Sequence, residues 1–143
     1  MEEFSQEQQI VIDKLIKQKY TEAYTEDEMG GETRTYLKLP KYLAPVRVAV
    51  SPLLKNKPEL VAKAREVFKL LKAEFGNVAY DDNGNIGKRY RRQDEIGTPH
   101  CVTIDFETLG EEKPELKDTV TVRDRDTGEQ ARVAMSDLIS HLK

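Results

Sequence analysis

Apolar residues recur at intervals of three or four along two long segments of the chain, which is the spacing of one face of an α-helix. The first segment covers about residues 6–24, and Ser5 and Gln8 in front of it fit a capping box. The second segment follows Asn56, which can cap it, and carries Pro58 in its first turn, where a missing N–H removes no helical hydrogen bond. Both segments are predicted to be amphipathic helices.

The second helix ends at Gly76, a residue type that commonly follows the last turn of a helix. Its apolar stripe consists of Leu60, Ala64, Val67, Phe68, Leu71 and Phe75. A turn over residues 82–85 precedes a further predicted helix, Ile86–Ile96, which Gly97 closes. A short final helix is expected over residues 136–141, with a serine as its cap.

Short runs with β-branched residues lie between these helices and predict five strands. A turn at residues 126–128 joins the last two strands as a hairpin. The predicted strands are Val46–Val50, Asn77–Asp81, His100–Phe106, Thr119–Arg123 and Gln130–Met135. From Val46 onward the order is therefore β-α-β-α-β-β-β-α. Helices that alternate with the first three strands predict an α/β fold, a three-layer α/β/α sandwich with a mixed five-stranded sheet, preceded by the N-terminal helix.

The segments between these elements divide the chain into two parts. Residues 25–32 are acidic, contain a Gly-Gly pair and are predicted to form a loop or linker. Thr33–Leu39 has β character, which Pro40 ends, and residues 107–118 read as a polar, acidic loop. We therefore expect an N-terminal helix with an acidic connector over residues 1–32 and a folded domain over residues 33–143.

Composition narrows the classes of protein to which the chain can belong. Its 143 residues suit one globular domain, and no apolar run approaches the roughly 20 residues needed to cross a bilayer. The N-terminus is acidic and unlike a secretory signal, so the simplest compartment is the cytosol. The formal net charge is −3, so any contact with nucleic acid must come from a local basic patch.

The densest basic run in the chain is residues 88–92, which contains Lys88, Arg89, Arg91 and Arg92. At about 100° per residue, Tyr90 shares one helix face with Ile86 and Gln93, and the four cations spread over the opposite face. Such a surface suits phosphates and unpaired bases, because arginine can bind phosphate in a bidentate way or stack on a base. The alternative is an ordinary solvated face, paired with the acids at residues 94–95.

Two carboxylates follow a predicted strand and are the second candidate group. Asp105 and Glu107 can accept hydrogen bonds from base amino groups, or they can be ordinary solubilising acids. Arg123 ends the next predicted strand, and Arg125 follows it with Asp124 and Asp126. These residues could equally form cross-strand ion pairs worth well under about 1 kcal/mol at a surface.

Residues of the kinds used in catalysis and metal binding are sparse. Cys101 is the only cysteine, which excludes an internal disulfide framework and most cysteine-based zinc sites. His100 lies beside it in a predicted strand, so the two side chains are expected on opposite faces, and neither His100 nor His141 has other ligands at metal spacing. The Gly30-Gly31 pair lacks the Lys-Ser/Thr of a phosphate-binding loop. No catalytic residues, metal or cofactor are therefore predicted.

Four ordered blocks are more distinctive than any single motif, and they are residues 43–53 (LAPVRVAVSPL), 80–99 (YDDNGNIGKRYRRQDEIGTP), 102–109 (VTIDFETL) and 119–126 (TVTVRDRD). The first resembles the start of the class IIa anticodon-binding domain, and the second resembles the signature stretch of the dimeric glycyl-tRNA synthetases. Residues 23–29 (AYTEDEM) are similar to the connector between the catalytic core and the anticodon-binding domain of those enzymes. The resemblance runs from about Thr21 to Leu138.

This resemblance implies a mixed sheet, flanked by helices, that holds the anticodon loop of glycine tRNA. Related domains read anticodon bases with groups on the second helix, on the strand after it and on the following strand. Carried onto this sequence, the RNA-binding positions are Lys88, Arg89, Arg91, Arg92, Asp105, Glu107 and Arg123. We expect Arg91 to contact a base or phosphate, and Asp105 or Glu107 to recognise a base edge.

The chain also departs from the family's whole enzymes, which carry a class II catalytic core with ATP-binding arginines ahead of the connector. Nothing in residues 1–20 resembles an ATP site, so the chain is not expected to aminoacylate tRNA on its own. A second hypothesis is an accessory or dimerisation subunit built on the same fold. In that case the helix at residues 6–24 would dock onto a synthetase catalytic domain or a second copy of the chain. No membrane partner is expected.

Overall fold

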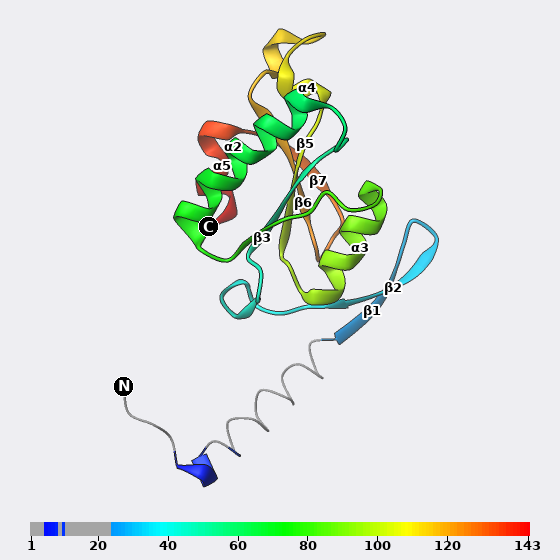
Figure 1. Cartoon of the computed structure of the whole chain (residues 1–143). Coiled ribbons are helices and arrows are strands. Elements are labelled where there is room, and N and C mark those ends of the chain that lie inside the picture. The colour runs from blue at the N-terminus through cyan, green and yellow to red at the C-terminus, as the bar shows by residue number, and fades with distance from the viewer. Residues whose placement is uncertain (1–4, 9, 11–23) are drawn as a thin grey trace.

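A mixed five-stranded sheet forms the centre of the fold (Figure 1) in the computed structural model, which describes residues 5–8, 10 and 24–143. The strand order is β4-β3-β5-β6-β7. Strand β3 pairs in parallel with β4 and β5, and β6 pairs antiparallel with β5 and β7. The strands are β3 (Val48–Pro52), β4 (Val78–Tyr80), β5 (His100–Ile104), β6 (Thr119–Asp124) and β7 (Gln130–Ala134). The predicted mixed sheet is thus confirmed.

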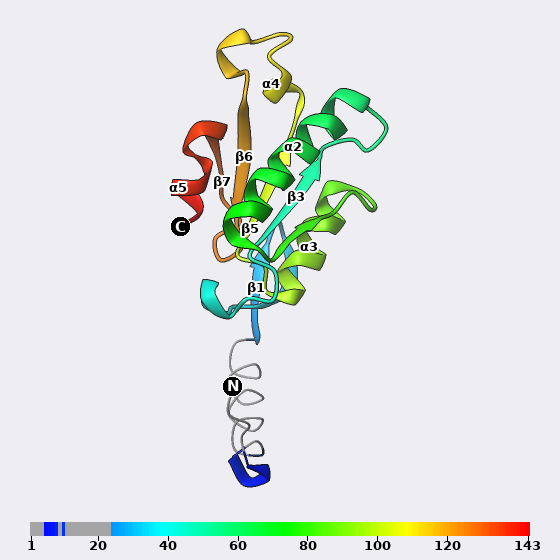
Figure 2. The ribbon, with the colours of Figure 1, turned by 60° about the vertical axis from the view of Figure 1, so that its left-hand side comes forward.

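Helices cover both faces of this sheet. Helix α2 (Pro58–Phe75) and helix α5 (Leu138–Leu142) pack on one face, and α3 (Ile86–Ile96) lies on the side opposite α5 in both views (Figures 1 and 2). Shorter elements are η1 (Lys41–Leu43), α4 (Phe106–Leu109), η2 (Pro114–Leu116) and η3 (Met135–Asp137). The three-layer arrangement follows the prediction. Among the described residues, no helix is both long and apolar enough to cross a membrane.

Period-two alternation along the strands divides the sheet into an apolar face and a polar face. The side chains that point toward α2 and α5 are at most 3% exposed and are Val48, Val50, Val102, Ile104, Val120 and Val122. Four members of the predicted stripe on α2, Leu60, Ala64, Val67 and Leu71, complete this core, and its two phenylalanines pack at the margin. The core therefore stabilises one face only and leaves the other available for polar side chains.

Several element ends differ from the sequence predictions for local reasons. Strand β3 continues to Pro52, two residues past its predicted end, because it pairs with the full length of β5. Strand β5 stops at Ile104, because Asp105 caps α4 in a reciprocal capping box with Thr108. The predicted loop over residues 107–118 thus contains helical turns. The predicted Asn56 cap is also wrong, because Lys57 precedes the first turn of α2 and makes no side-chain cap.

The acidic segment expected to be a loop is instead a β-hairpin. Strands β1 (Tyr24–Met29) and β2 (Glu32–Leu37) pair antiparallel across Gly30 and Gly31, whose φ angles of 63° and 81° suit a two-residue hairpin turn. The expected boundary between residues 32 and 33 therefore falls inside a regular element.

The predicted N-terminal helix is described only at its start. Ser5 and Gln8 make the predicted capping box, with the Gln8 amide donating to Ser5 Oγ (3.2 Å) and the Ser5 amide donating to Gln8 Oε1 (2.9 Å). Residues 6–8 and 10 are helical, whereas Tyr24, at the predicted end of the helix, belongs to β1. The rest of the predicted helix lies outside the described residues.

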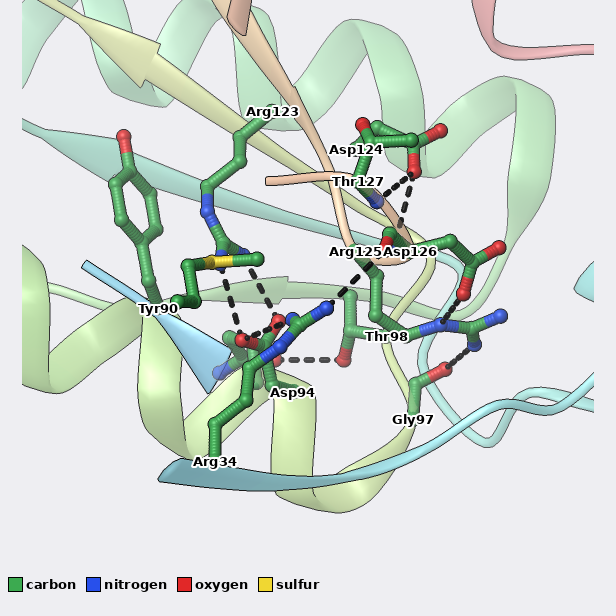
Figure 3. Close-up of polar contacts among 12 residues, drawn as sticks. Arg34, Tyr90, Asp94, Gly97, Thr98, Arg123, Asp124, Arg125, Asp126 and Thr127 are labelled. Carbon is green, nitrogen blue, oxygen red and sulfur yellow. Dashed lines mark hydrogen bonds and ion pairs between the residues drawn. The ribbon is translucent and has the colours of Figure 1, made fainter. Parts of the chain in front are cut away.

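A buried carboxylate between two guanidinium groups fixes the hairpin to the domain (Figure 3). Arg34 of β2 donates from Nη1 to Asp94 Oδ2 on α3 (3.0 Å), and Arg123 of β6 donates from Nη1 to Asp94 Oδ1 (2.8 Å). The three side chains are between 4% and 7% exposed. We call these residues the Asp94 cluster. Because they come from β2, α3 and β6, the cluster joins all three elements.

Further contacts hold the two ends of the hairpin in place. At its tip, Met29 Sδ accepts from Arg123 Nη2 (3.3 Å), and a Cβ at Gly128 would collide with the Met29 side chain. Just beyond its base, Arg125 donates to the carbonyl of Gly97 (2.9 Å; Figure 3) and to that of Leu39 (2.8 Å). The hairpin is therefore docked along its length. A two-stranded hairpin is only marginally stable alone, so this docking is what keeps it ordered.

Replacement of Asp94 by alanine should destabilise the domain strongly. The change leaves Arg34 and Arg123 buried without their shared counter-charge, and loss of one partner of a buried pair typically costs about 3–5 kcal/mol. Urea unfolding measures the loss, and Glu95→Ala, at the neighbouring exposed position, should stay within about 0.5 kcal/mol of the wild type. A loss below about 1 kcal/mol for Asp94→Ala would contradict this role of the cluster.

His100 is buried on the apolar side of β5 and is held neutral. Its side chain is 8% exposed, and Nδ1 has no hydrogen-bond partner within the described part of the chain. Burial, and secondarily the charge of Lys41, lowers the pKa of His100 to about 4, although Asp124, with Oδ2 at 3.8 Å from Nε2, acts in the opposite direction. His141, as expected, is exposed.

The low pKa of His100 predicts a loss of stability in mild acid. The unfolded chain binds a proton at this histidine below pH 6.5, whereas the folded chain does so only near pH 4, so the unfolding free energy falls as pH drops through this window. The loss by pH 4.5 should be about 2 kcal/mol. Urea unfolding between pH 7 and 4.5 should show a smaller dependence of the unfolding free energy on pH for His100→Gln than for the wild type. Equal dependence in the two proteins would rule out His100 as the source.

Candidate nucleic-acid interface

The buried side of α3 carries a guanidinium with a structural role. Arg89 is 3% exposed and donates to the main-chain carbonyls of Pro52 (2.5 Å), Gly84 (2.9 Å) and Asp82 (3.1 Å). These bonds fasten the loop before α3 to the end of β3. The expectation that all four cations of residues 88–92 share one solvent-facing surface is therefore wrong, because one of them is buried among carbonyl groups.

Arg92 also faces the β3–β4 side of the helix. Its Nη2 donates to Asp81 Oδ1 (2.7 Å), and Gln93 Nε2 donates to Asp81 Oδ2 (3.0 Å). Burial alone would raise the pKa of Asp81, but the hydrogen bonds from Arg92 and Gln93 outweigh it and lower the pKa below its usual value. Asp81 is thus an ionised anchor for Arg92, and this pair lies on the opposite side of α3 from Arg123.

The remaining two cations of the run are exposed. Arg91 is 56% exposed and reaches across to the hairpin, where its Nη2 lies 2.7 Å from Glu32 Oε2. Lys88 lies in the first turn of α3 with an exposed side chain. Asp94, considered above as a partner for the helix's own cations, instead pairs with Arg34 and Arg123. Among the arginines of this run, Arg91 therefore has the most exposed guanidinium and is held least firmly by other residues.

A groove lies between the hairpin, α3 and the β6–β7 hairpin, and we call it the hairpin groove. It has a volume of about 330 Å³, and its lining includes Met29, Thr35, Tyr90, Arg91, Arg123 and Gln130. Arg123 packs over the Tyr90 ring at 4.8 Å from its centroid. The groove thus brings together two of the predicted RNA-binding residues, Arg91 and Arg123.

A row of polar side chains runs from this groove across the sheet. The Tyr90 hydroxyl lies 2.8 Å from Thr103 Oγ1 on β5, Thr103 is paired with Thr121 on β6, and Thr121 is paired with Arg132 on β7. We call Thr103, Thr121 and Arg132 the cross-strand row. Strand pairing places these three side chains side by side on the polar face of the sheet. The row links the hairpin groove to the end of β5.

The predicted carboxylates lie at the far end of the row and share one arginine. Arg132 Nη2 lies 2.5 Å from Asp105 Oδ2 and 2.7 Å from Glu107 Oε2. Burial would raise the pKa of Asp105, but the hydrogen bonds and charge of Arg132, together with bonds from Thr108, lower it. Asp105 is therefore ionised and oriented. Sequence reasoning missed Arg132, although the hairpin register, once known, places it opposite Thr121.

An exposed aromatic ring stands beside these carboxylates. Phe106 is 44% exposed, and Lys57 Nζ lies 4.8 Å from its ring centroid. The two residues, with Glu107, Lys113 and two further glutamates, line a second groove of about 360 Å³. Phe106 was predicted at the end of a strand, but it lies in the first turn of α4.

The predicted site residues therefore separate into two groups. Arg91, Arg123, Asp105 and Glu107 border one polar surface formed by the hairpin groove, the cross-strand row and the groove at Phe106. Arg89 and Arg92 lie on the other side of α3 and hold loops in place, and Lys88 is exposed at its first turn.

Groups suited to redox, nucleophilic or metal chemistry are not assembled on this surface. Burial raises the pKa of the Cys101 thiol to about 12, so the thiol stays protonated at neutral pH. Within residues 5–8, 10 and 24–143, no three His, Cys, Asp or Glu side chains are grouped so as to hold a metal ion. The arrangement is instead suited to binding a polar ligand through charged and aromatic groups.

Comparison with known proteins assigns this arrangement to a family. The family described as "Anticodon binding domain" matches residues 47–143. The glycine–tRNA ligase of Thermus thermophilus is 48% identical over 137 residues, a match that covers 92% of this chain and 27% of that ligase. The corresponding ligase of Deinococcus radiodurans is 50% identical over 136 residues, covering 89% of this chain and 26% of the ligase.

The glycine–tRNA ligase of Clostridium kluyveri is 45% identical over 138 residues, covering 96% of this chain and 28% of the ligase. The chain thus spans about a quarter of the length of these relatives. The match agrees with the four sequence blocks and with the observed sheet. The chain therefore belongs to the anticodon-binding domain family and is similar to the anticodon-binding part of glycine–tRNA ligases.

Proposed function

We propose that this chain binds the anticodon stem-loop of glycine tRNA through the polar surface that Arg91, Arg123, Asp105 and Glu107 border. The observation that carries the proposal is the continuity of this surface, from the exposed guanidinium of Arg91 at one end to oriented carboxylates at the other. Cations supply sequence-independent attraction to phosphates, and acceptors aimed at bases supply discrimination. An unpaired RNA loop presents both its phosphates and its base edges to one protein surface.

The carboxylate end of the surface is suited to recognising a base edge. Asp105 is ionised and held by Arg132 and Thr108, so its oxygens keep a fixed position toward an incoming amino group. A carboxylate accepts hydrogen bonds from the amino group of cytosine. Phe106 beside it offers an exposed ring on which an unpaired base can stack. Arg132 balances the carboxylate charge and lessens its repulsion of the RNA backbone.

The cationic end is suited to phosphates. Among the residues that the structure describes, Arg91 is paired only with an exposed glutamate, Glu32. Such surface pairs contribute at most about 1 kcal/mol, so a phosphate can replace Glu32 at small cost. Arg123 adds a guanidinium whose direction the Asp94 cluster fixes. This local arrangement offers cations to RNA in a chain whose net charge is −3.

We further propose that the chain acts as a binding module and does not ligate glycine to tRNA by itself. It spans about a quarter of the length of its ligase relatives, and its family match is to an anticodon-binding domain. The alternative role as an accessory or dimerisation subunit depended on the helix predicted at residues 6–24, most of which lies outside the described residues. That role remains a prediction.

Arg91→Ala should weaken binding of an anticodon stem-loop RNA. Loss of one phosphate contact on an unpaired strand lowers affinity and reduces the slope of log K against log salt by about 0.7. Fluorescence anisotropy of a labelled stem-loop at several salt concentrations measures both quantities. Lys69→Ala removes an exposed cation from α2, on the other face of the sheet, and should leave the slope unchanged. An Arg91 variant that behaves like the Lys69 variant would exclude this phosphate contact.

Asp105→Asn should impair discrimination between anticodon loops while the fold is kept, because asparagine can also cap α4. We expect the preference for the glycine anticodon over a loop with one substituted base to fall by about 1–3 kcal/mol. Competition binding with the two loops measures this preference, with Glu95→Gln as a matched exposed control. A wild-type domain that binds the two loops equally well would remove the sequence-specific part of the proposal.

A further inference from the structure

The hairpin groove has one wall that lies outside the part of the chain matched by the family. Met29, Arg34 and Thr35 belong to the hairpin, whereas the family match begins at residue 47. The opposite wall is formed by α3, with Tyr90 and Arg91. The groove therefore exists only because the hairpin is docked beside α3, and its ligand would touch both.

The charges around this groove suit an exchangeable anion. The guanidinium groups of Arg34, Arg91 and Arg123 line it, and Asp94 binds two of them from below. At the rim, Arg91 is paired with Glu32, which is 73% exposed. An exposed carboxylate of this kind is easily displaced by a phosphate, which arginine can bind through two parallel hydrogen bonds. With Glu32 displaced, the guanidinium of Arg91 can bind the ligand, while Arg34 and Arg123 stay bound to Asp94.

Docking also makes the hairpin wall rigid before any ligand binds. Arg34 is held by bonds to Asp27 (2.6 Å), Asp94 (3.0 Å) and the carbonyl of Asp126 (3.2 Å). Tyr36 and Leu37 at the base of the hairpin are at most 4% exposed. A wall that is already ordered costs little conformational entropy when a ligand binds against it.

We propose that the hairpin Tyr24–Leu37 is part of the RNA-binding surface and that the hairpin groove holds the phosphodiester backbone of the unpaired strand. This inference rests on the proposed function and extends it to a segment outside the matched family region. Bases then lie along the cross-strand row, while the adjoining backbone passes between Thr35 of β2 and Arg91 of α3. The hairpin thus contributes directly to affinity as well as connecting segments of the chain.

Thr35 provides a test with a closely matched control. Thr35 is exposed, lines the groove and pairs with Glu26 across the hairpin. Thr33 is exposed on the same strand, pairs with Glu28 in the equivalent way and is not among the residues that line the groove. The same substitution at either position therefore changes the net charge equally and places the new side chain opposite a glutamate in both cases.

The experiment compares binding of an anticodon stem-loop RNA by Thr35→Lys, Thr35→Glu, Thr33→Lys and Thr33→Glu. We expect Thr35→Lys to raise affinity about threefold or more and to steepen the salt slope by about 0.7, the value for one added phosphate contact on a single strand. Thr35→Glu should lower affinity by a similar factor. Both Thr33 variants should stay within about twofold of the wild type, because screening weakens charges that do not touch the strand.

A second pair of variants tests whether a phosphate replaces Glu32 as the partner of Arg91 at the rim of the hairpin groove. Glu32→Gln should raise affinity about twofold to threefold, because the phosphate no longer competes with a carboxylate for Arg91. Glu28→Gln removes an equal charge from the hairpin's outward side and should raise affinity less. Equal effects of the two substitutions would contradict exchange of a carboxylate for a phosphate.

The outcomes separate this inference from the proposed function. Thr35 and Thr33 variants that bind alike would overturn the role of the hairpin. If Arg91→Ala still weakens binding and Asp105→Asn still lowers the preference for the glycine anticodon, the RNA-binding surface stays intact. A wild-type chain with no affinity for the stem-loop would overturn both. Changes confined to the Thr35 variants would support the hairpin as one wall of the RNA-binding groove.

Discussion

The arrangement of this domain depends on one buried carboxylate that two guanidinium groups share. Asp94 is 4% exposed, and a carboxylate so deep in the protein is tolerated only when it is fully paired. Arg34 and Arg123 supply that pairing from β2 and β6, so satisfying Asp94 requires the hairpin, α3 and the sheet to be assembled together. The same contact sets the direction of Arg123 over Tyr90 and so the shape of the hairpin groove. A local electrostatic requirement thereby determines a surface made from three distant segments.

The rest of the surface follows from strand pairing. One face of the sheet is apolar and packs against α2 and α5. The other face can therefore carry polar side chains without any loss of packing in the hydrophobic core. Parallel and antiparallel neighbours in one sheet bring Thr103, Thr121 and Arg132 into a single row. At the end of that row, Asp105 is both the cap of α4 and the partner of Arg132, which gives it a fixed position and an ionised state. The proposed reading of bases depends on this fixed position.

Sequence reasoning predicted those elements whose periodicity is strong and whose ends carry a chemical signal. Helix Ile86–Ile96, closed by Gly97, has the predicted bounds, and the five strands of the central sheet and helices α2, α3 and α5 follow in the predicted order. The β1–β2 hairpin was missed because its first strand contains Glu26, Asp27 and Glu28, residues that are poor in strands, and its stability comes from Arg34 docking onto a residue 60 positions away. Helical periodicity could not show that Arg89 is buried, because its partners are carbonyls of loops. Arg132 was missed because its carboxylate partners belong to another part of the chain.

In the proposed complex, RNA lies on the polar face of the sheet and against the docked hairpin. Amide chemical-shift mapping with an isotope-labelled chain and an unlabelled anticodon stem-loop tests this placement directly. We predict that the shifts concentrate at Thr35, Arg91, Thr103, Phe106 and Thr121, with little change along the exposed side of α2. Shifts gathered on α2 and α5, with the polar face unaffected, would contradict the account.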